Sequence, residues 1–148
     1  MINDQLQMTG ALTVEKNGQV VREIDNLVVT AGKTLVAARL AGGGSNVTHM
    51  AVGTSTAAAS ASQTALSSEL DRNGLTTSGG TASSNTVQYA CTWNAGDGTG
   101  ALTEAGLFTA SSGGTMLART VFSVVNKGAN DSITITSVSY THLTLPTN

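Results

Sequence analysis

Two apolar runs around a short break constrain the fold of this chain more than any other feature. The runs are Leu102–Thr109 and Met116–Phe122, and the break is Ser111–Thr115, which contains two glycines. A short break of this kind, with residues that accept positive φ, joins two antiparallel strands in a β-hairpin. The stretch from Ala101 to Phe122 therefore predicts a hairpin at the centre of a β-rich protein.

Further strand signals occur on both sides of this hairpin. In Thr86–Trp93, the clearest strand, apolar residues occupy every odd position, as in a strand with one buried face. Residues 7–30 predict a first hairpin around Asn17-Gly18, with a bulge or bend near Asp25-Asn26. Other strands are expected at Thr48–Thr54, Leu75–Thr77 and Ser132–Thr136, joined by turns at 78–84, 94–100 and 126–131.

Helical signals are few. Lys33–Ala41 is the best helix candidate, with Thr30 as its N-terminal cap and Gly42–Gly44 as its end. Thr64–Leu70 is expected to form one or two helical turns, and Ala57–Ser62 is expected to be a surface loop. The chain is thus mostly strands and turns.

These segments predict one all-β domain over residues 1–136. We expect a mainly antiparallel β-sandwich or small barrel of about seven strands, with one short helix at 33–41 and an N-terminal arm at 1–9. The composition agrees, because 23 Thr, 17 Gly and only 11% charged residues suit a β-protein with many turns. Disordered chains are instead rich in charge and poor in β-branched residues.

Charge and cysteine content exclude several classes of protein. The net charge is −2 and the seven basic residues are scattered, which argues against a nucleic-acid partner. Cys91 is the sole cysteine, so we expect neither an intrachain disulfide nor a thiolate metal site. No apolar run approaches the roughly 20 residues of a membrane span, and the N-terminus does not read as a signal peptide. We expect a protein made in a cytosol, without a membrane partner.

One glycine-rich stretch has the spacing of a nucleotide-binding loop. Gly96–Ala101 fits Gly-x-Gly-x-x-Ala, but that motif works only where it opens a helix, and a strand is expected here. Asp97 lacks a second carboxylate at calcium-loop spacing. We interpret the stretch as a turn, with no cofactor.

The remaining reactive residues do not form a catalytic constellation. His49 and His142 are the only histidines, and no Gly-x-Ser-x-Gly motif accompanies them. His49 reads as a structural strand residue. Cys91 shares its strand face with Val87, Tyr89 and Trp93, which predicts a buried, inert thiol. We assign no catalytic, cofactor-binding or metal-binding residue and expect no enzyme activity.

Glu104 and Arg119 lie on the two strands of the central hairpin. A loop of Ser111–Thr115 sets Glu104 opposite Phe122 and Arg119 opposite Leu107, which keeps the two charges apart. The sequence therefore predicts two outward-facing charges without an ion pair.

Three groups of motifs follow one another along the chain. The first is Asn26–Lys33 with a helix that ends in Arg39-Leu40, and the second is His49–Thr54 with Thr64–Arg72. The third is Leu102–Phe108, Leu117–Phe122, Asn126–Gly128 and Ser132–Thr136. Over residues 10–136 they resemble a family of small structural proteins of tailed-bacteriophage virions, of the tail-fibre-like or tail-collar type.

The resemblance stops after Thr136, where one more β-run is expected. Residues 137–148 instead look like translated sequencing-adapter read-through, and the apolar positions change phase between Ile135 and Val138. We treat 137–148 as a non-native tail and expect its deletion to leave stability unchanged.

The resemblance implies a non-enzymatic virion protein, assembled in the host cytoplasm, that serves as a tail or fibre adaptor or as capsid decoration. Exposed strand edges and the arm at 1–9 would pair with other virion proteins, and particle symmetry implies a homo-oligomer, with a trimer as our expectation. The alternative is a receptor- or carbohydrate-binding module, whose site would need exposed aromatics. The candidates are Trp93, Tyr89, Tyr140, Phe108 and Phe122.

Overall fold

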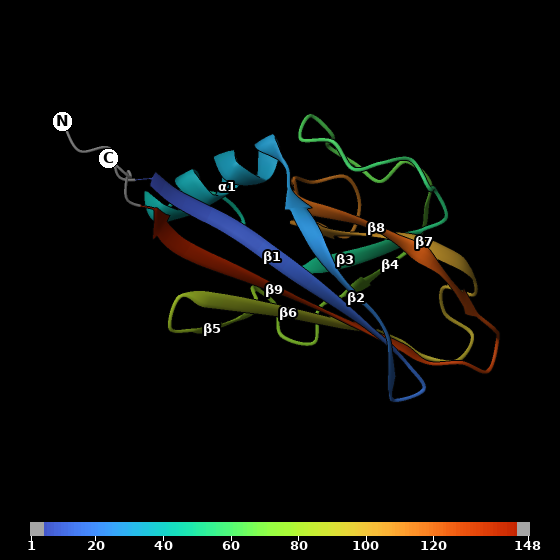
Figure 1. Cartoon of the computed structure of the whole chain (residues 1–148). Helices are drawn as coiled ribbons and strands as arrows, with labels where there is room; N and C mark the ends of the chain where they lie inside the picture. The colour runs from blue at the N-terminus through green and yellow to red at the C-terminus, as the bar shows by residue number, and fades with distance from the viewer. Residues whose placement is uncertain (1–4, 145–148) are drawn as a thin grey trace.

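The structure, a computed structural model, describes residues 5–144. It contains nine strands and one helix within that range (Figure 1). They are β1 (Gln5–Lys16), β2 (Gln19–Val28), α1 (Thr30–Leu40), β3 (His49–Gly53), β4 (Glu69–Gly74), β5 (Thr81–Ser83), β6 (Thr86–Trp93), β7 (Gly100–Phe108), β8 (Met116–Lys127) and β9 (Ile133–Thr144). The helix is too short to span a membrane.

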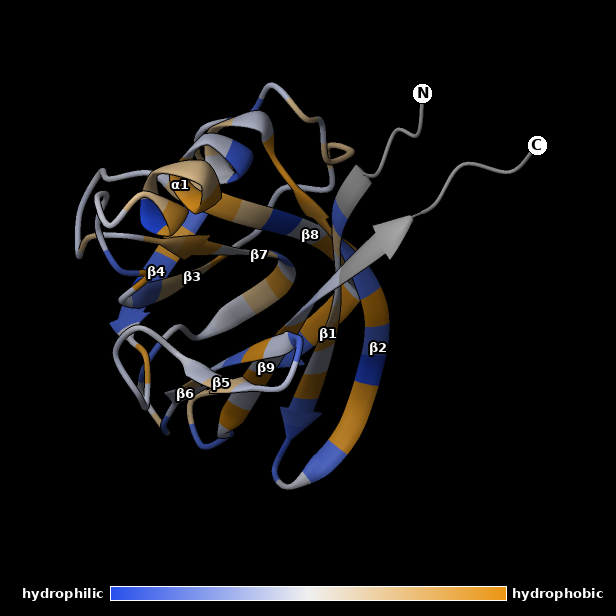
Figure 2. Cartoon of the chain, turned by 90° about the vertical axis from the view of Figure 1, so that its left-hand side faces the viewer, coloured by the Kyte–Doolittle hydropathy of each residue, from blue (hydrophilic) through white to orange (hydrophobic). Residues whose placement is uncertain are grey.

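The nine strands form one antiparallel sheet in the order β4-β3-β7-β8-β2-β1-β9-β6-β5. The sheet curls so that its two halves face each other, with β2 between them (Figure 2). Near β4 the curl almost closes, because the Thr76 N–H donates to the Ala90 carbonyl at 2.8 Å. The expected fold class, mainly antiparallel β with one short helix, is confirmed, with nine strands in place of about seven.

The core lies between the two halves of the sheet. Strand β6 has the predicted bounds, and its Tyr89, Cys91 and Trp93 point inward with at most 7% exposure. Ile133 and Ile135 of β9 are fully buried beside them. Along β2, apolar and polar bands follow one another (Figure 2) but do not alternate residue by residue, and only Val28 at its end is buried.

The first hairpin forms as predicted around Asn17 and Gly18, whose φ angles are +51° and +82°. The bulge is not at Asp25-Asn26, however. It lies beside the turn, where the register shifts between Val14 and Glu15. The apolar residues of β2 change from one face of the strand to the other, but this change does not mark a bend. Val20 lies next to the turn and is 52% exposed, so its side chain does not define a buried face.

The helix begins at Thr30, three residues before the predicted start. Val29 is its N-terminal cap residue and makes no side-chain capping bond, so the expected capping role of Thr30 is wrong. The end is as predicted: Gly42 has φ +81°, and the Gly43 N–H donates to the Ala38 carbonyl at 2.9 Å.

Two expectations between β3 and β6 are wrong. Residues 64–68 form no helical turn, because the Ser67 and Ser68 amides donate to the Glu104 carboxylate instead of to helical carbonyls. Residues 75–77 are not a strand either. These residues follow β4 and bridge two parts of the sheet. The Leu75 amide donates to the Thr48 carbonyl, just before β3, and the Thr76 amide donates to the Ala90 carbonyl of β6.

Strand β9 extends well past the predicted end at Thr136. It pairs with β1 along its whole length and with β6 as far as Tyr140. Ser137 and Ser139 continue its inward face and are fully buried. Because residues 137–144 lie within the sheet, we no longer expect their deletion to leave stability unchanged; the read-through origin of 137–148 stays a prediction.

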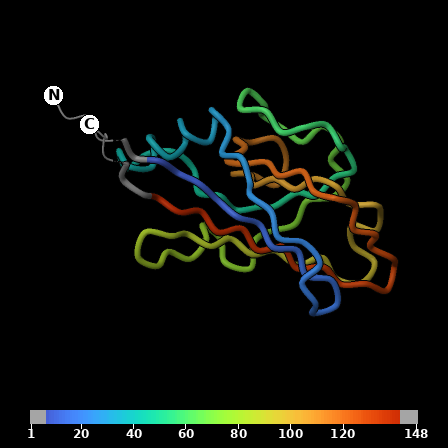
Figure 3. The backbone as a smooth tube through the Cα atoms, in the orientation of Figure 1, coloured from blue at the N-terminus to red at the C-terminus, as the bar shows by residue number. Residues whose placement is uncertain are grey.

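The start of β1 and the end of β9 lie side by side, next to α1 (Figure 3). Residues 5–9, expected as part of a free N-terminal arm, belong to β1. Residues 1–4 and 145–148 lie outside the described range, and so does the side chain of His142.

Candidate functional site

Glu104 and Arg119 form a fully buried ion pair, which overturns the expected outward, separate charges. Nε and Nη2 of Arg119 donate to Oε2 of Glu104 at 3.0 and 2.8 Å, and both side chains have 0% exposure. The hairpin loop is longer than expected, since β7 ends at Phe108, and a bulge between Leu107 and Phe108 shifts the register, so that Glu104 faces Val121 and Arg119 faces Gly106. The two charges therefore meet diagonally across the strands.

The pair holds down the loop of residues 54–68, which crosses the outer face of β7 and β8 (Figure 1). Glu104 also accepts the backbone amides of Ser55, Ser67 and Ser68 at 3.3, 3.1 and 2.7 Å. Arg119 donates to the Gln63 side chain and the Ala57 carbonyl, each at 3.0 Å. We call this network the Glu104–Arg119 clasp.

The clasp leaves its carboxylate no role as a base. The two carboxylate oxygens of Glu104 accept five hydrogen bonds, three from backbone amides and two from Arg119. The side chain is not exposed to solvent. A general base must instead reach the proton that it removes. Beneath the loop lies a small second core that includes Leu66, Phe108 and Met116, so the clasp and this core fix the loop together.

Arg72 of β4 makes a second group of contacts between distant segments, which the sequence did not predict. Its guanidinium binds Glu69 at 2.6 and 3.1 Å and lies 3.8 Å from the centre of the Phe108 ring. Nη1 donates to the carbonyls of Ala110 and Gly113 at 2.9 Å, which anchors the tip of the central hairpin. A register shift in β4 allows this, since it brings Glu69 and Arg72 to one side of the strand.

The other reactive residues stay apart. Cys91 is fully buried, as predicted, and burial raises the pKa of its thiol to about 12, with the nearby Asp71 carboxylate adding to the rise. His49 is half-buried on β3, with Nδ1 2.7 Å from the Thr48 hydroxyl. As predicted, the stretch Gly96–Ala101 opens no helix: it begins as a turn, and its last two residues are the start of β7. Within residues 5–144, no three potential metal ligands come together.

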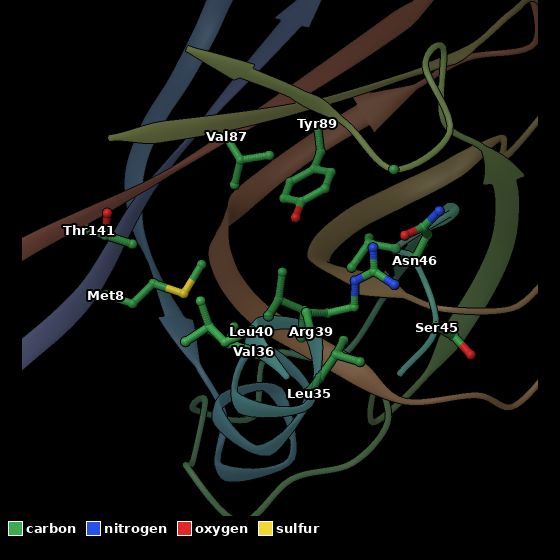
Figure 4. A pocket seen from close by; sticks show the side chains of 13 residues that line it. Met8, Leu35, Val36, Arg39, Leu40, Ser45, Asn46, Val87, Tyr89 and Thr141 are labelled. Carbon is green, nitrogen blue, oxygen red and sulfur yellow. The ribbon is translucent and has the colours of Figure 1, made fainter. Parts of the chain in front are cut away.

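One hollow in the surface lies between α1 and the inner face of the sheet (Figure 4). We call it the α1 pocket; its volume is about 380 Å³. Its apolar lining includes Met8, Val36, Leu40 and Val87, and the Tyr89 hydroxyl points into it (Figure 4). These residues come from β1, α1 and β6, which are distant in the sequence.

One charged side chain, Arg39, lines the α1 pocket. Burial raises the pKa of the neighbouring Tyr89 hydroxyl, and the Arg39 charge opposes that rise. Leu40 at the rim is 77% exposed. A second hollow continues past Met8 and Val36 and adds Lys33. The α1 pocket can thus accept an apolar group. Arg39 in this pocket and Lys33 in the adjoining hollow are positive charges that an acidic group could approach.

No protein-family model, curated protein or solved structure matches this chain.

Proposed function

We propose that this chain is a non-enzymatic structural protein of a bacteriophage virion, acting through contacts with neighbouring subunits. The observation that carries the proposal is the Glu104–Arg119 clasp. The motifs through which the sequence resembles the phage family include Thr64–Arg72, Leu102–Phe108 and Leu117–Phe122, and the clasp joins all three. The two charged residues of these motifs therefore stabilise the fold of the chain itself.

The geometry favours a face over a strand edge as the contact surface. Edge strand β5 has only three residues, and edge strand β4 carries the Glu69–Arg72 ion pair; both features discourage strand addition. The α1 pocket instead combines apolar walls with the exposed Leu40. An apolar side chain of a neighbouring virion protein, flanked by an acidic residue, would complement this pocket and the Arg39 charge.

The carbohydrate-binding alternative receives little support from the placement of the aromatic residues. Trp93, Phe108, Phe122 and Tyr89 are each at most 7% exposed, so their rings are not presented to a sugar. Tyr140, at 40%, is the one exposed large aromatic residue among the described side chains.

Mass spectrometry of purified particles, separated into heads and tails, tests the proposal. We expect the protein in one of the two fractions: a copy number matching the head shell means capsid decoration, and one matching the tail symmetry means an adaptor. Presence only in the lysate, with none in particles, would refute a virion role.

A paired variant tests the contact surface. Leu40→Asp places a charge at the rim of the α1 pocket, where the side chain is 77% exposed and little packing is lost. Thr34→Asp puts the same charge elsewhere on α1, away from the pocket. We expect Leu40→Asp to reduce incorporation into particles and Thr34→Asp to leave it unchanged. Equal incorporation of both variants would contradict the assigned surface.

A further inference from the structure

A small hollow lies between the two halves of the sheet, separate from the α1 pocket. Its volume is about 10 Å³, which is about the space that the centre of one water molecule needs. Most of its wall is apolar or glycine, including Leu12, Met50 and Gly106. Three polar side chains also line it: Asn26 of β2, Thr120 of β8 and Ser137 of β9.

Two of these side chains have a buried oxygen without a hydrogen-bond partner among the residues that the structure describes. They are Oδ1 of Asn26 and Oγ1 of Thr120. The third, Ser137, accepts a bond from Nδ2 of Asn26 at 2.9 Å, which leaves its own hydroxyl hydrogen to donate. Leaving such groups unpaired in a protein interior destabilises the folded state.

The hollow lies where β2 separates from β8. The ladder between these strands consists of Leu27 with Arg119 and Val28 with Ala118, and the next pair would be Asn26 with Thr120. Asn26 leans over Gly10 of β1, where the absence of a side chain leaves room for its amide. Asn26 and Thr120 thus face the same hollow across a gap that direct pairing no longer closes.

We propose that this hollow binds one water molecule, which joins β2, β8 and β9. The water donates to Oδ1 of Asn26 and Oγ1 of Thr120, and accepts from the hydroxyl of Ser137. Three such bonds are typical of a buried structural water. A metal ion would be a poor occupant, because the three polar side chains are neutral and no carboxylate lines the hollow.

A crystal structure of the full chain, refined with its solvent, gives the direct test. We expect a density peak within hydrogen-bond distance of all three side chains. An interior without such a peak, with the side chains otherwise placed as described, would overturn the proposal whatever the variants below do.

Two substitutions of buried hydroxyls give an independent test in solution. Thr120→Val removes a proposed ligand of the water with little change of shape. Ser139→Ala is the control, because Oγ of Ser139 is also buried and unpartnered but does not line the hollow. Urea unfolding then measures both variants.

We expect Thr120→Val to raise the equilibrium constant for unfolding about tenfold, since it leaves the water with an unmade bond. Ser139→Ala should leave that constant unchanged or lower it, because it removes a hydroxyl without a partner. If Thr120→Val stabilises the protein as Ser139→Ala does, the Thr120 hydroxyl has no water partner and the proposal fails.

Discussion

Replacing Arg119 by Met tests the clasp at its centre. The substitution removes both bonds to Glu104 and those to Gln63 and Ala57, while keeping a long side chain in place. Glu104 would remain buried with only three backbone amides around it. Losing one partner of a buried ion pair costs about 3–5 kcal/mol.

For a chain of this length, a loss of about 4 kcal/mol lowers Tm by about 10 °C. Thermal and urea unfolding, followed by circular dichroism, measure this loss. Limited proteolysis supplies a local readout, because the clasp holds residues 54–68: cleavage in that loop should become faster in Arg119→Met. Glu104→Gln in the same background then shows whether the buried charge causes the loss, since neutralising it should recover part of the stability.

Arg22→Met is the matched control. Arg22 also binds backbone carbonyls, of Ser123 and Val124, but it has no carboxylate partner and is only half-buried. We expect it to cost less than about 1 kcal/mol. If both variants melt at the same temperature, the buried pair contributes nothing specific and the reasoning is refuted.

Four further outcomes follow from the same structure. Gly53→Ala should lower Tm by several degrees and loosen the 54–68 loop, because a Cβ at Gly53 would collide with the Ser68 carbonyl and Glu104; an unchanged melting curve would contradict the close packing. Truncation after Thr136 should lower Tm, because it removes the part of β9 that lies between β1 and β6; equal melting temperatures would instead support a dispensable tail. Cys91 should not react with a thiol reagent at pH 8 until the protein unfolds, because its pKa is raised to about 12 and its side chain is buried; fast labelling of the native protein would show otherwise. The raised pKa also means that the contribution of the neutral thiol to stability is lost as the pH rises from about 9 toward 12, and Cys91→Val should weaken that dependence in urea unfolding.

Local signals in the sequence predicted several elements correctly. The alternation in Thr86–Trp93 and the turn at Asn17-Gly18 each depend on adjacent residues, so no distant contact was needed to find them. The fold class followed from the number of such segments. The same reasoning placed Cys91 on a buried face.

The clasp could not be predicted in this way. The length of the hairpin loop and a bulge between Leu107 and Phe108 set its register, and nothing in a single sequence marks that bulge. Three of the donors to Glu104 are backbone amides, which any residue type supplies. The α1 pocket was equally hidden, because Met8, Leu40 and Tyr89 meet only when the sheet curls.

The expected helix at 64–70 shows the competition between local and tertiary bonds. Thr64 and the residues after it have acceptable helix propensity, but the amides of Ser67 and Ser68 bind a buried carboxylate from a strand distant in the sequence. A short helix has little stability of its own, so this tertiary contact decides the conformation.

If the protein is found in purified virions, a reconstruction of that particle would test the central proposal most directly, namely that the protein works through a subunit contact at the α1 pocket. We predict density from a neighbouring virion protein against Met8, Val36 and Leu40, with an acidic side chain near Arg39. A particle in which the protein is present but the α1 pocket faces solvent in every copy would contradict the claim.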